Sequence, residues 1–392
     1  MSAIPQASII IPAYNEEKGL PVVLEQLRKT LNTREISPDD SLADGTEVII
    51  IDDGSSDKTA EIARGYSCKL ISHQKNMGKG KAIQTGIANS RGEKIIFIDA
   101  DGTYPVEEVL HIITRLDDND VVFTAREWKN IPILNLIGNK MISAVIKVFS
   151  GFTGHDPLSG LYGIRRSVIE KLDVETSDFS IETEIVVKST VMGFNMTELP
   201  IRYNRRLGES KINPFKDGLK ILKLIFSLLV VYNPLMTFIL PGIFLCLIGF
   251  IILLLTWAGP FHLSRNITLD THTFIFSVMA ILVGSQVIIQ GVILDLYAVK
   301  HRYKKPGLAL AIFKPLFFRG LFLLGLIILT VGIIITIKAA FIWIDNGFQP
   351  YFDTRRAVIA LLLNLFGVQL IFSSLIGSVF VREIKNDKTS SG

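Results

Sequence analysis

The sequence predicts an α/β domain built on a mostly parallel sheet, followed by an all-α membrane domain of about four helices. Strand and helix patterns alternate through the first half of the chain, which favours a parallel sheet with helices on both faces. Two apolar strands in this half end in acidic pairs, Asp52-Asp53 and Asp99-Ala100-Asp101. Beyond residue 219, Leu, Ile, Val and Phe dominate, which indicates membrane-spanning segments.

The first elements follow from apolar spacing. Residues 7–12 form a continuous apolar run of the kind that lies inside a parallel sheet. Residues 16–31 carry apolar side chains at helical spacing, which predicts the first helix. The second strand is predicted at residues 47–51 and the second helix at 57–66. Residues 69–72 are predicted as a short third strand.

A Gly-rich turn precedes the third helix, predicted over residues 79–89, and the fourth strand is predicted at 94–98. The fourth helix, 105–116, has a proline in its first turn, where a missing N–H leaves no hydrogen bond unmade. A further strand is expected at 121–124. Because ligands of such sheets bind at the carboxyl ends of the strands, we expect a nucleotide-and-metal crevice where Asn15, Asp53 and Asp101 lie.

The second half contains four apolar stretches with almost no internal charge. Each has about the 20 residues that a helix needs to cross the hydrocarbon core, which makes buried core helices a poor alternative. The expected spans are residues 236–257, 273–296, 320–343 and 356–381.

Residues 215–232, just before the first span, combine lysines with apolar residues. We expect an amphipathic helix at the membrane surface, with an ordinary surface helix as the alternative. Its apolar residues Leu222, Ile225 and Phe226 are expected to enter the acyl boundary, and its lysines to meet lipid phosphates. These lysines are Lys216, Lys220 and Lys223.

Loop charges predict the orientation of the spans. The loop between the second and third spans is rich in Lys and Arg, whereas the first outer loop contains only Arg265. The positive-inside rule therefore predicts a multi-pass protein of the cell membrane with the first domain and both termini in the cytoplasm, and the first residues show no signal peptide. The expected divisions are a soluble domain at 1–213, a surface helix at 214–232, a membrane domain at 233–382 and a tail at 383–392.

Composition excludes some kinds of site. The formal net charge of +4 does not favour nucleic-acid binding. Cys68 and Cys246 fall in different halves, so neither a disulfide framework nor a cysteine metal site is expected. The six histidines show no metal-binding spacing and are expected to be ordinary surface or interface residues.

Polar residues near three strand ends are candidates for binding a nucleotide. Tyr14 can stack on a base and Glu16 can accept from a base edge or a hydroxyl, although Asn-Glu also starts helices. Asp53 is the candidate for base recognition. Lys79 can reach a diphosphate, and a plain turn before a helix is an equal alternative for its Gly-rich loop.

In this order, the motifs P-x-Y-N-E, D-D-G-S-x-D-x-T, N-x-G-K-G-x-A and D-A-D resemble glycosyltransferase family 2, which has the Rossmann-like GT-A fold of nucleotide-diphospho-sugar transferases. Residues 156–162 and 205–211 resemble the dolichyl-phosphate mannose synthase and polyprenyl-phosphate glycosyltransferase branch, some members of which have a C-terminal membrane domain. The resemblance covers residues 7–225.

The resemblance implies a sugar-nucleotide donor (GDP-mannose, UDP-glucose or a UDP-hexosamine) and a polyprenyl or dolichyl phosphate acceptor. Asp99 and Asp101 would hold Mg²⁺ or Mn²⁺. Thr103 stands where the family often has a Gln metal ligand, which leaves the second metal contact open. The resemblance would place Pro12, Tyr14, Glu16, Ile51 and Asp53 around the nucleotide, Asp99, Ala100 and Asp101 at the metal and diphosphate, and Arg126, Arg205 and Lys211 at substrate phosphates.

A phosphate acceptor changes what the catalytic site needs. A phosphate monoester is already largely anionic at neutral pH, so it can attack the anomeric carbon without a strong general base. Arginines then suit phosphate binding, and a metal neutralises the leaving diphosphate. Asp156 is either near the acceptor or a structural hydrogen-bond partner, and both alternatives stay open. Glu182 and Glu184, two apart on a helix, are not leading candidates.

Two other functions are compatible with the general organisation. A processive polysaccharide synthase would typically carry a Q-x-x-R-W motif, which Trp128, Trp257 and Trp343 do not complete. A non-catalytic lipid transporter with a nucleotide-sensing domain would not need the intact D-A-D motif. The expected partners are the donor, the lipid acceptor and the bilayer, with a homo-oligomer through the membrane domain left open.

Overall fold

The computed structural model forms two compact units, Met1–Leu228 and Leu229–Gly392. Their division falls inside residues 214–232, the predicted surface helix, and the domain limits drawn from the sequence remain predictions. The structure describes residues 5–31, 45–66, 68–127, 133–178, 180–208, 214–264, 267–301, 303, 314–348 and 354–390.

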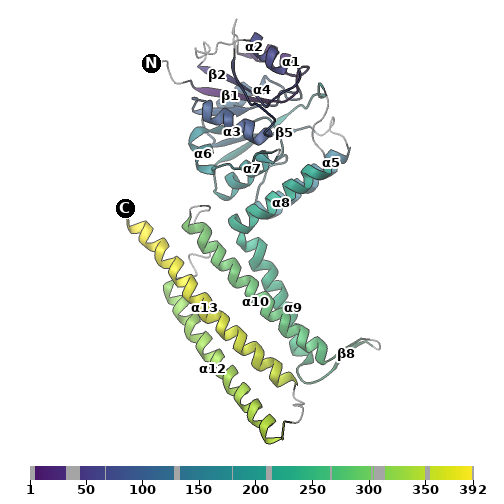
Figure 1. Cartoon of the computed structure of the whole chain (residues 1–392), viewed down its shortest axis with the longest axis vertical. Coiled ribbons are helices and arrows are strands. Elements are labelled where there is room, and N and C mark those ends of the chain that lie inside the picture. Colours follow the sequence, from purple (N-terminus) through teal and green to yellow (C-terminus); the bar gives the residue numbers. More distant parts are fainter. Residues whose placement is uncertain are drawn as a thin grey trace. The chain divides into compact units, whose positions relative to one another are not determined.

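A seven-stranded sheet lies at the centre of the first unit (Figure 1). Its order is β3-β2-β1-β4-β6-β5-β7, and β6 runs antiparallel between β4 and β5 while the other neighbours are parallel. The predicted mostly parallel sheet is confirmed. Its strands are β1 (Ala7–Ala13), β2 (Thr46–Asp52), β3 (Lys69–Ser72), β4 (Lys94–Phe97), β5 (Val121–Arg126), β6 (Tyr162–Arg165) and β7 (Met196–Ile201).

Alternating strand residues bury both faces of the sheet. Ile9 and Ile11 of β1 belong to one core cluster with side chains of α1 (Leu20–Thr30), α2 (Thr59–Gly65) and α4 (Glu108–Arg115). Ile10 points the other way, against Gly86 of α3 (Lys79–Asn89), where an added Cβ would lie 2.4 Å from Ile10 Cγ2. Helices therefore cover both faces, as predicted.

The first predicted helix begins later than residue 16. The backbone N–H groups of Glu16 and Glu17 donate to Thr59 Oγ1 and Asp57 Oδ2 across the neighbouring loop, so this segment forms a turn and α1 starts at Leu20. The helix predicted at residues 215–232 is present as α8 (Pro214–Tyr232), which extends past Leu228 into the second unit. No bounds were predicted for the remaining helices of the first unit, which are α5 (Ile133–Ser150), α6 (Arg166–Leu172) and α7 (Ile181–Val191).

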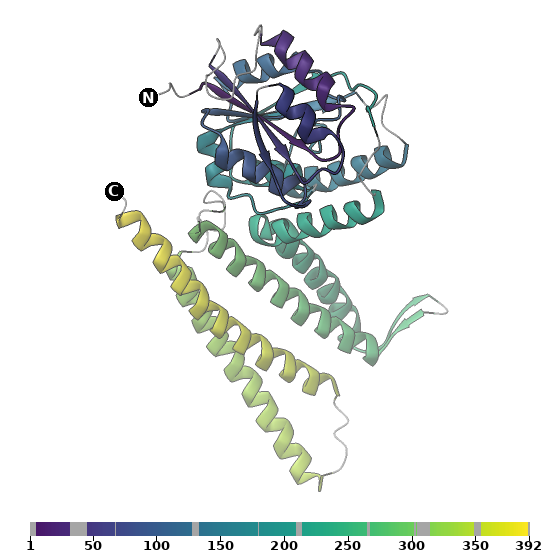
Figure 2. The same cartoon turned by 45° about the horizontal axis from the view of Figure 1, so that its top comes forward.

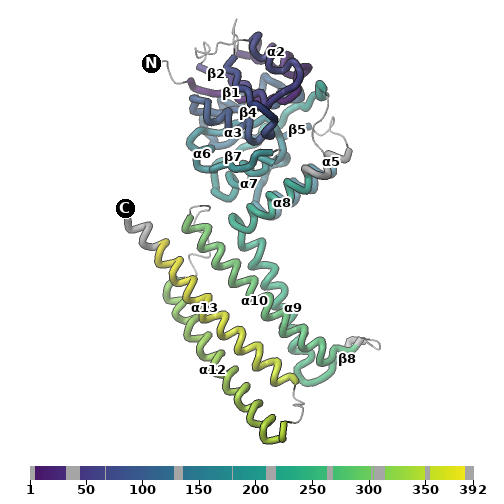
Figure 3. The backbone as a smooth tube through the Cα atoms, viewed as in Figure 1, coloured from purple at the N-terminus to yellow at the C-terminus, as the bar shows by residue number. Residues whose placement is uncertain are grey.

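Among the described residues of the second unit, four helical segments are long and apolar enough to cross a membrane, which confirms the four predicted spans. Helix α9 neighbours α10, and α12 neighbours α13 (Figures 2 and 3). A hairpin of β8 (Phe261–Ser264) and β9 (Ile267–Leu269) joins α9 to α10. The helices are η2 (Leu235–Ile239), which continues into α9 (Leu240–Thr256), α10 (Thr271–Lys300), α12 (Pro315–Asp345) and α13 (Thr354–Ser390).

Candidate active site

A cleft of about 250 Å³ lies at the carboxyl ends of β1, β2 and β4, where the acidic strand ends come together. Of the residues predicted for the nucleotide and the metal, all but two line it. Ile51 is fully buried within β2, and the Asn15 side chain accepts from the N–H of Ser56 in the neighbouring loop. The cleft is lined by Pro12, Tyr14, Glu16, Asp53, Lys79, Asp99, Ala100 and Asp101, together with Ala13, Asn76, Gly78, Ala82 and Arg206.

Asp101 is held in place by its own turn. Thr103 donates to Asp101 Oδ1 through both its backbone N–H, at 3.0 Å, and its Oγ1, at 2.5 Å. The other oxygen, Oδ2, lies 2.8 Å from Arg206 Nη1. Thr103 is almost fully buried, so its side chain orients the carboxylate.

Lys79 and Asp99, which line the cleft, form a compact charge cluster with the buried Glu182. Lys79 Nζ lies 2.6 Å from both Asp99 Oδ1 and Glu182 Oε1. Burial raises the pKa of Asp99 to about 6, against the opposing effect of Lys79. Burial alone would lower the pKa of Lys79, but the two carboxylates raise it well above its usual value. The sequence missed the part Glu182 plays here, because only the fold brings α7 to α3.

Glycine at position 160 makes room for this cluster. A Cβ added to Gly160 would lie 2.2 Å from Asp99 Oδ2. Tyr104 Oη, which accepts from the Gly160 N–H at 2.6 Å, fixes the same segment. The Ser159-Gly160 turn, which lies within the segment 156–162 noted in the sequence, therefore packs directly against the Asp99 carboxylate.

Asp53 faces the Gly-rich loop that leads into α3. Its carboxylate accepts from the N–H groups of Met77 and Gly78 at 2.9 and 2.8 Å, and it lies 2.6 Å from His73 Nδ1. These contacts hold the loop that presents Lys79, while base recognition by Asp53 remains a prediction. His73 is largely buried between Asp53 and Thr85, so the expectation that it is an ordinary surface or interface residue was wrong.

A loop over residues 202–208 closes one side of the cleft. The N–H of Leu207 donates to the Asp101 carbonyl at 3.2 Å, and the N–H of Asn204 donates to the Thr103 carbonyl at 2.9 Å. Arg206 Nη2 lies 2.5 Å from Glu16 Oε1. The sequence named Arg205, which is exposed, and missed its neighbour Arg206. Lys211 lies outside the described residues.

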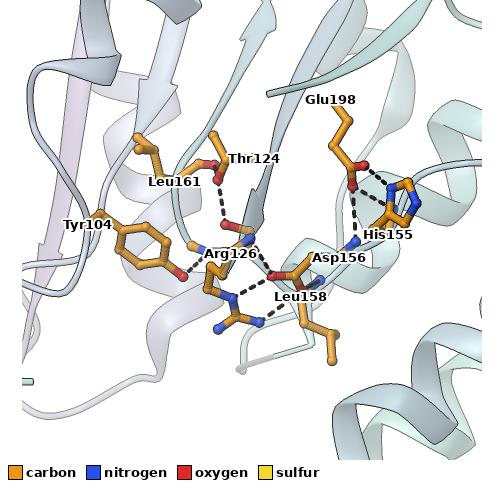
Figure 4. A network of polar contacts seen from close by, with 10 residues as sticks. Tyr104, Thr124, Arg126, His155, Asp156, Leu158, Leu161 and Glu198 are labelled. Atoms are coloured by element: carbon orange, nitrogen blue, oxygen red, sulfur yellow. Dashed lines mark hydrogen bonds and ion pairs between the residues drawn. The ribbon is translucent and has the colours of Figure 1, made fainter. Parts of the chain in front are cut away.

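Arg126 and Asp156 form a two-pronged ion pair beside the cleft (Figure 4). Nε and Nη2 of Arg126 lie 2.6 and 2.9 Å from the two Asp156 oxygens, and the Asp156 side chain is only 1% exposed. Glu198 accepts from the Asp156 N–H, and the Arg126 guanidinium stacks 5.3 Å from the Tyr203 ring centre. These contacts favour the structural alternative for Asp156; catalytic roles for Arg126 and Asp156 remain predictions.

The cleft offers a metal few protein ligands. Among the described residues, no group of three or more His, Cys, Asp or Glu side chains is arranged to hold a metal ion. Mg²⁺ is usually bound by one or two carboxylates plus substrate phosphates. Asp101, oriented by Thr103, with Asp99 beside it, fits such a cation, because a diphosphate would complete its oxygen ligands.

Comparison with known families matches both halves of the chain. Residues 8–173 match the family described as Glycosyl transferase family 2. Residues 292–381 match the family described as Glycosyltransferase family 2 C-terminal transmembrane region.

Three curated proteins show how far the similarity extends. A dolichyl-phosphate hexose transferase of Haloferax volcanii is 30% identical over 219 residues, covering 55% of this chain and 90% of that protein. The low-salt glycan biosynthesis hexosyltransferase Agl6 of the same organism is 25% identical over 384 residues, covering 96% and 89%. An undecaprenyl-phosphate 4-deoxy-4-formamido-L-arabinose transferase of Salmonella choleraesuis is 28% identical over 300 residues, covering 74% and 87%.

Proposed function

This chain belongs to glycosyltransferase family 2 and has the GT-A fold, and we propose that it transfers a sugar from a nucleotide-sugar donor to a polyprenyl phosphate at the cytoplasmic face of the cell membrane. The observation that carries this proposal is the cleft where Asp99 and Asp101 meet Lys79 and Arg206, in a chain whose described residues include four helices long and apolar enough to cross a membrane. The acceptors in the names of two relatives support it.

The charges of the cleft suit a donor diphosphate and an anionic acceptor. The acceptor phosphate oxygen attacks the anomeric carbon, the bond from that carbon to the nucleoside diphosphate breaks, and its electrons leave with the diphosphate. A single displacement inverts the anomeric configuration. No strong base is required, which agrees with an Asp156 occupied by Arg126.

Cations of the chain would stabilise this transfer. Arg206 and Lys79 already lie in the cleft, and Arg suits two-pronged binding of phosphate oxygens. Asp101 and Asp99 would hold Mg²⁺ or Mn²⁺, which supplies positive charge for the leaving diphosphate. We assign the exposed Arg205, with Lys211, to the acceptor phosphate.

Helix α8 supports approach to a lipid surface. Leu222 and Phe226 are 42% and 63% exposed on one stripe, with Lys223 beside them. Ile225 is only 1% exposed, so its predicted entry into the acyl boundary was wrong; it faces the protein interior. Helix α5 of the same unit exposes a second apolar stripe, formed by Ile137, Met141 and Val148.

Replacing Leu222 and Phe226 together by Ser should raise the KM for a long-chain polyprenyl phosphate at least about tenfold, because burying one such side chain contributes about 1.5–3 kcal/mol. The KM for the donor should stay unchanged. Initial rates in bilayer nanodiscs, with each substrate varied in turn, measure both constants. Leu110→Ser on α4 is the control, because Leu110 is 40% exposed, close to the 42% of Leu222. Equal weakening of both substrates would contradict a lipid-facing α8.

A panel of nucleotide sugars, each offered with a polyprenyl phosphate and Mg²⁺ or Mn²⁺, tests the proposed function and identifies the donor. We expect one donor to yield a lipid-extractable product with a single sugar. A growing water-soluble polymer would favour the processive synthase. Donor binding without turnover, for every donor and both metals, would favour the non-catalytic transporter.

A further inference from the structure

The guanidinium of Arg206 bridges the two carboxylates that face each other across the cleft. Nη1 lies 2.8 Å from Asp101 Oδ2, and Nη2 lies 2.5 Å from Glu16 Oε1. The Arg206 side chain is 27% exposed and Asp101 only 7%, so the contact is partly shielded from water. One cation therefore neutralises two carboxylates from different strand ends.

These contacts occupy much of the Asp101 carboxylate. A carboxylate has about four lone-pair positions. The Thr103 N–H and Oγ1 use two of them on Oδ1, and Arg206 uses one on Oδ2. A cation that binds Oδ2 must therefore share this oxygen with a guanidinium or displace it, and like charges in such contact repel strongly.

The backbone of Arg206 belongs to a loop that is bonded to the turn carrying Asp101. The next residue, Leu207, donates its N–H to the Asp101 carbonyl, and Asn204 donates to the Thr103 carbonyl. Leu207 also packs over Gly102, where an added Cβ would lie 3.0 Å from Leu207 Cδ1. These contacts keep the backbone at Arg206 next to Asp101, so the guanidinium can leave Oδ2 only by rotation of its side chain or by release of the loop.

We propose that Arg206 and the divalent cation compete for Asp101 Oδ2, and that the donor diphosphate relieves this competition by giving Arg206 another anion to bind. Arg206 is then a positioning residue that couples the binding of the cation to the binding of the donor. This inference rests on the proposed function, which places the cation at Asp101. It predicts that the cation binds weakly alone and more tightly with a nucleoside diphosphate.

The test measures Mn²⁺ binding to the full chain in detergent by electron paramagnetic resonance. Each protein is measured without a nucleotide and then with UDP and with GDP. Without nucleotide, Arg206→Gln should bind Mn²⁺ at least about tenfold more tightly than the wild type, because a nearby like charge is gone. With the nucleotide, this advantage should disappear. Mn²⁺ binds the free nucleotide equally in both samples, so the ratio of the two Mn²⁺ dissociation constants reflects the proteins alone.

Arg205→Gln is the matched control, since it removes the same charge from the adjacent exposed position; its nucleotide-free Mn²⁺ affinity should equal that of the wild type. Arg206→Lys provides a second variant if Gln prevents folding. A lysine has a single ammonium nitrogen and lacks the fork by which Arg206 contacts Asp101 and Glu16 through separate nitrogens, so the Mn²⁺ affinity of this variant should also exceed that of the wild type.

Equal nucleotide-free Mn²⁺ affinities in the wild type and a folded Arg206 variant would overturn the competition while leaving the proposed transfer intact. An equal gain in Arg205→Gln would also overturn it, because the effect would then be general charge. No Mn²⁺ binding to any protein, even with both nucleotides, would instead contradict the metal site of the proposed function.

Discussion

Replacing Asp101 by Asn should lower the rate of sugar transfer by roughly 10³-fold or more, since the lost charge removes several kcal/mol of stabilisation from the leaving diphosphate. The chain should remain folded, because Asn keeps a carbonyl oxygen that can accept from Thr103. Product formation at saturating donor, acceptor and metal measures this loss. Circular dichroism checks the fold.

Asp118→Asn is the matched control for this prediction, because Asp118 is an exposed carboxylate outside the cleft. Its transfer rate should equal that of the wild type. Near-normal transfer by Asp101→Asn in excess chelator would show that neither this carboxylate nor a metal takes part.

Replacing Lys79 by Met should both destabilise the first unit and suppress transfer. It removes the cation between Asp99 and Glu182, whose side chains are 24% and 5% exposed. Breaking a buried pair on one side typically costs about 3–5 kcal/mol, because the remaining charges are left uncompensated. The apparent unfolding midpoint of the full chain and the transfer rate measure the two effects.

Two further variants separate this explanation from a general loss of charge. Arg28→Met breaks an exposed pair with Glu25 and should leave the stability nearly unchanged, because water screens such a pair. Adding Glu182→Gln to Lys79→Met should restore part of the stability, because one stranded carboxylate becomes neutral. If Lys79→Met is no less stable than Arg28→Met, the ion pairs of Lys79 with Asp99 and Glu182 do not stabilise the fold.

The parts of the fold that the sequence predicted are those with simple local signals. Strands β1, β2 and β4 are buried on both faces, so each is a continuous apolar run. The four spans could likewise be predicted from the length and hydropathy of their sequences. Strand β6 carries no such signal: it has four residues, contains Gly163, and enters an otherwise parallel region in the antiparallel direction.

The same contrast holds for the candidate site. Asp53, Asp99 and Asp101 could be placed because they follow strands whose carboxyl ends must meet. Arg205 and Arg206 could not be told apart, because which of two adjacent arginines turns inward depends on the loop's backbone bonds to Asp101 and Thr103. The contact of Glu182 with Lys79 could not be predicted, because it depends on the packing of α7 near α3, which is distant in the sequence.

The central claim is that a lipid phosphate oxygen accepts the sugar. Phosphorus NMR of the full chain in nanodiscs with polyprenyl phosphate, the identified donor and Mg²⁺ tests it most directly. The monoester resonance of the lipid should be replaced by a phosphodiester resonance, with one nucleoside diphosphate released for each diester formed. Consumption of the donor with the lipid monoester unchanged would contradict the account.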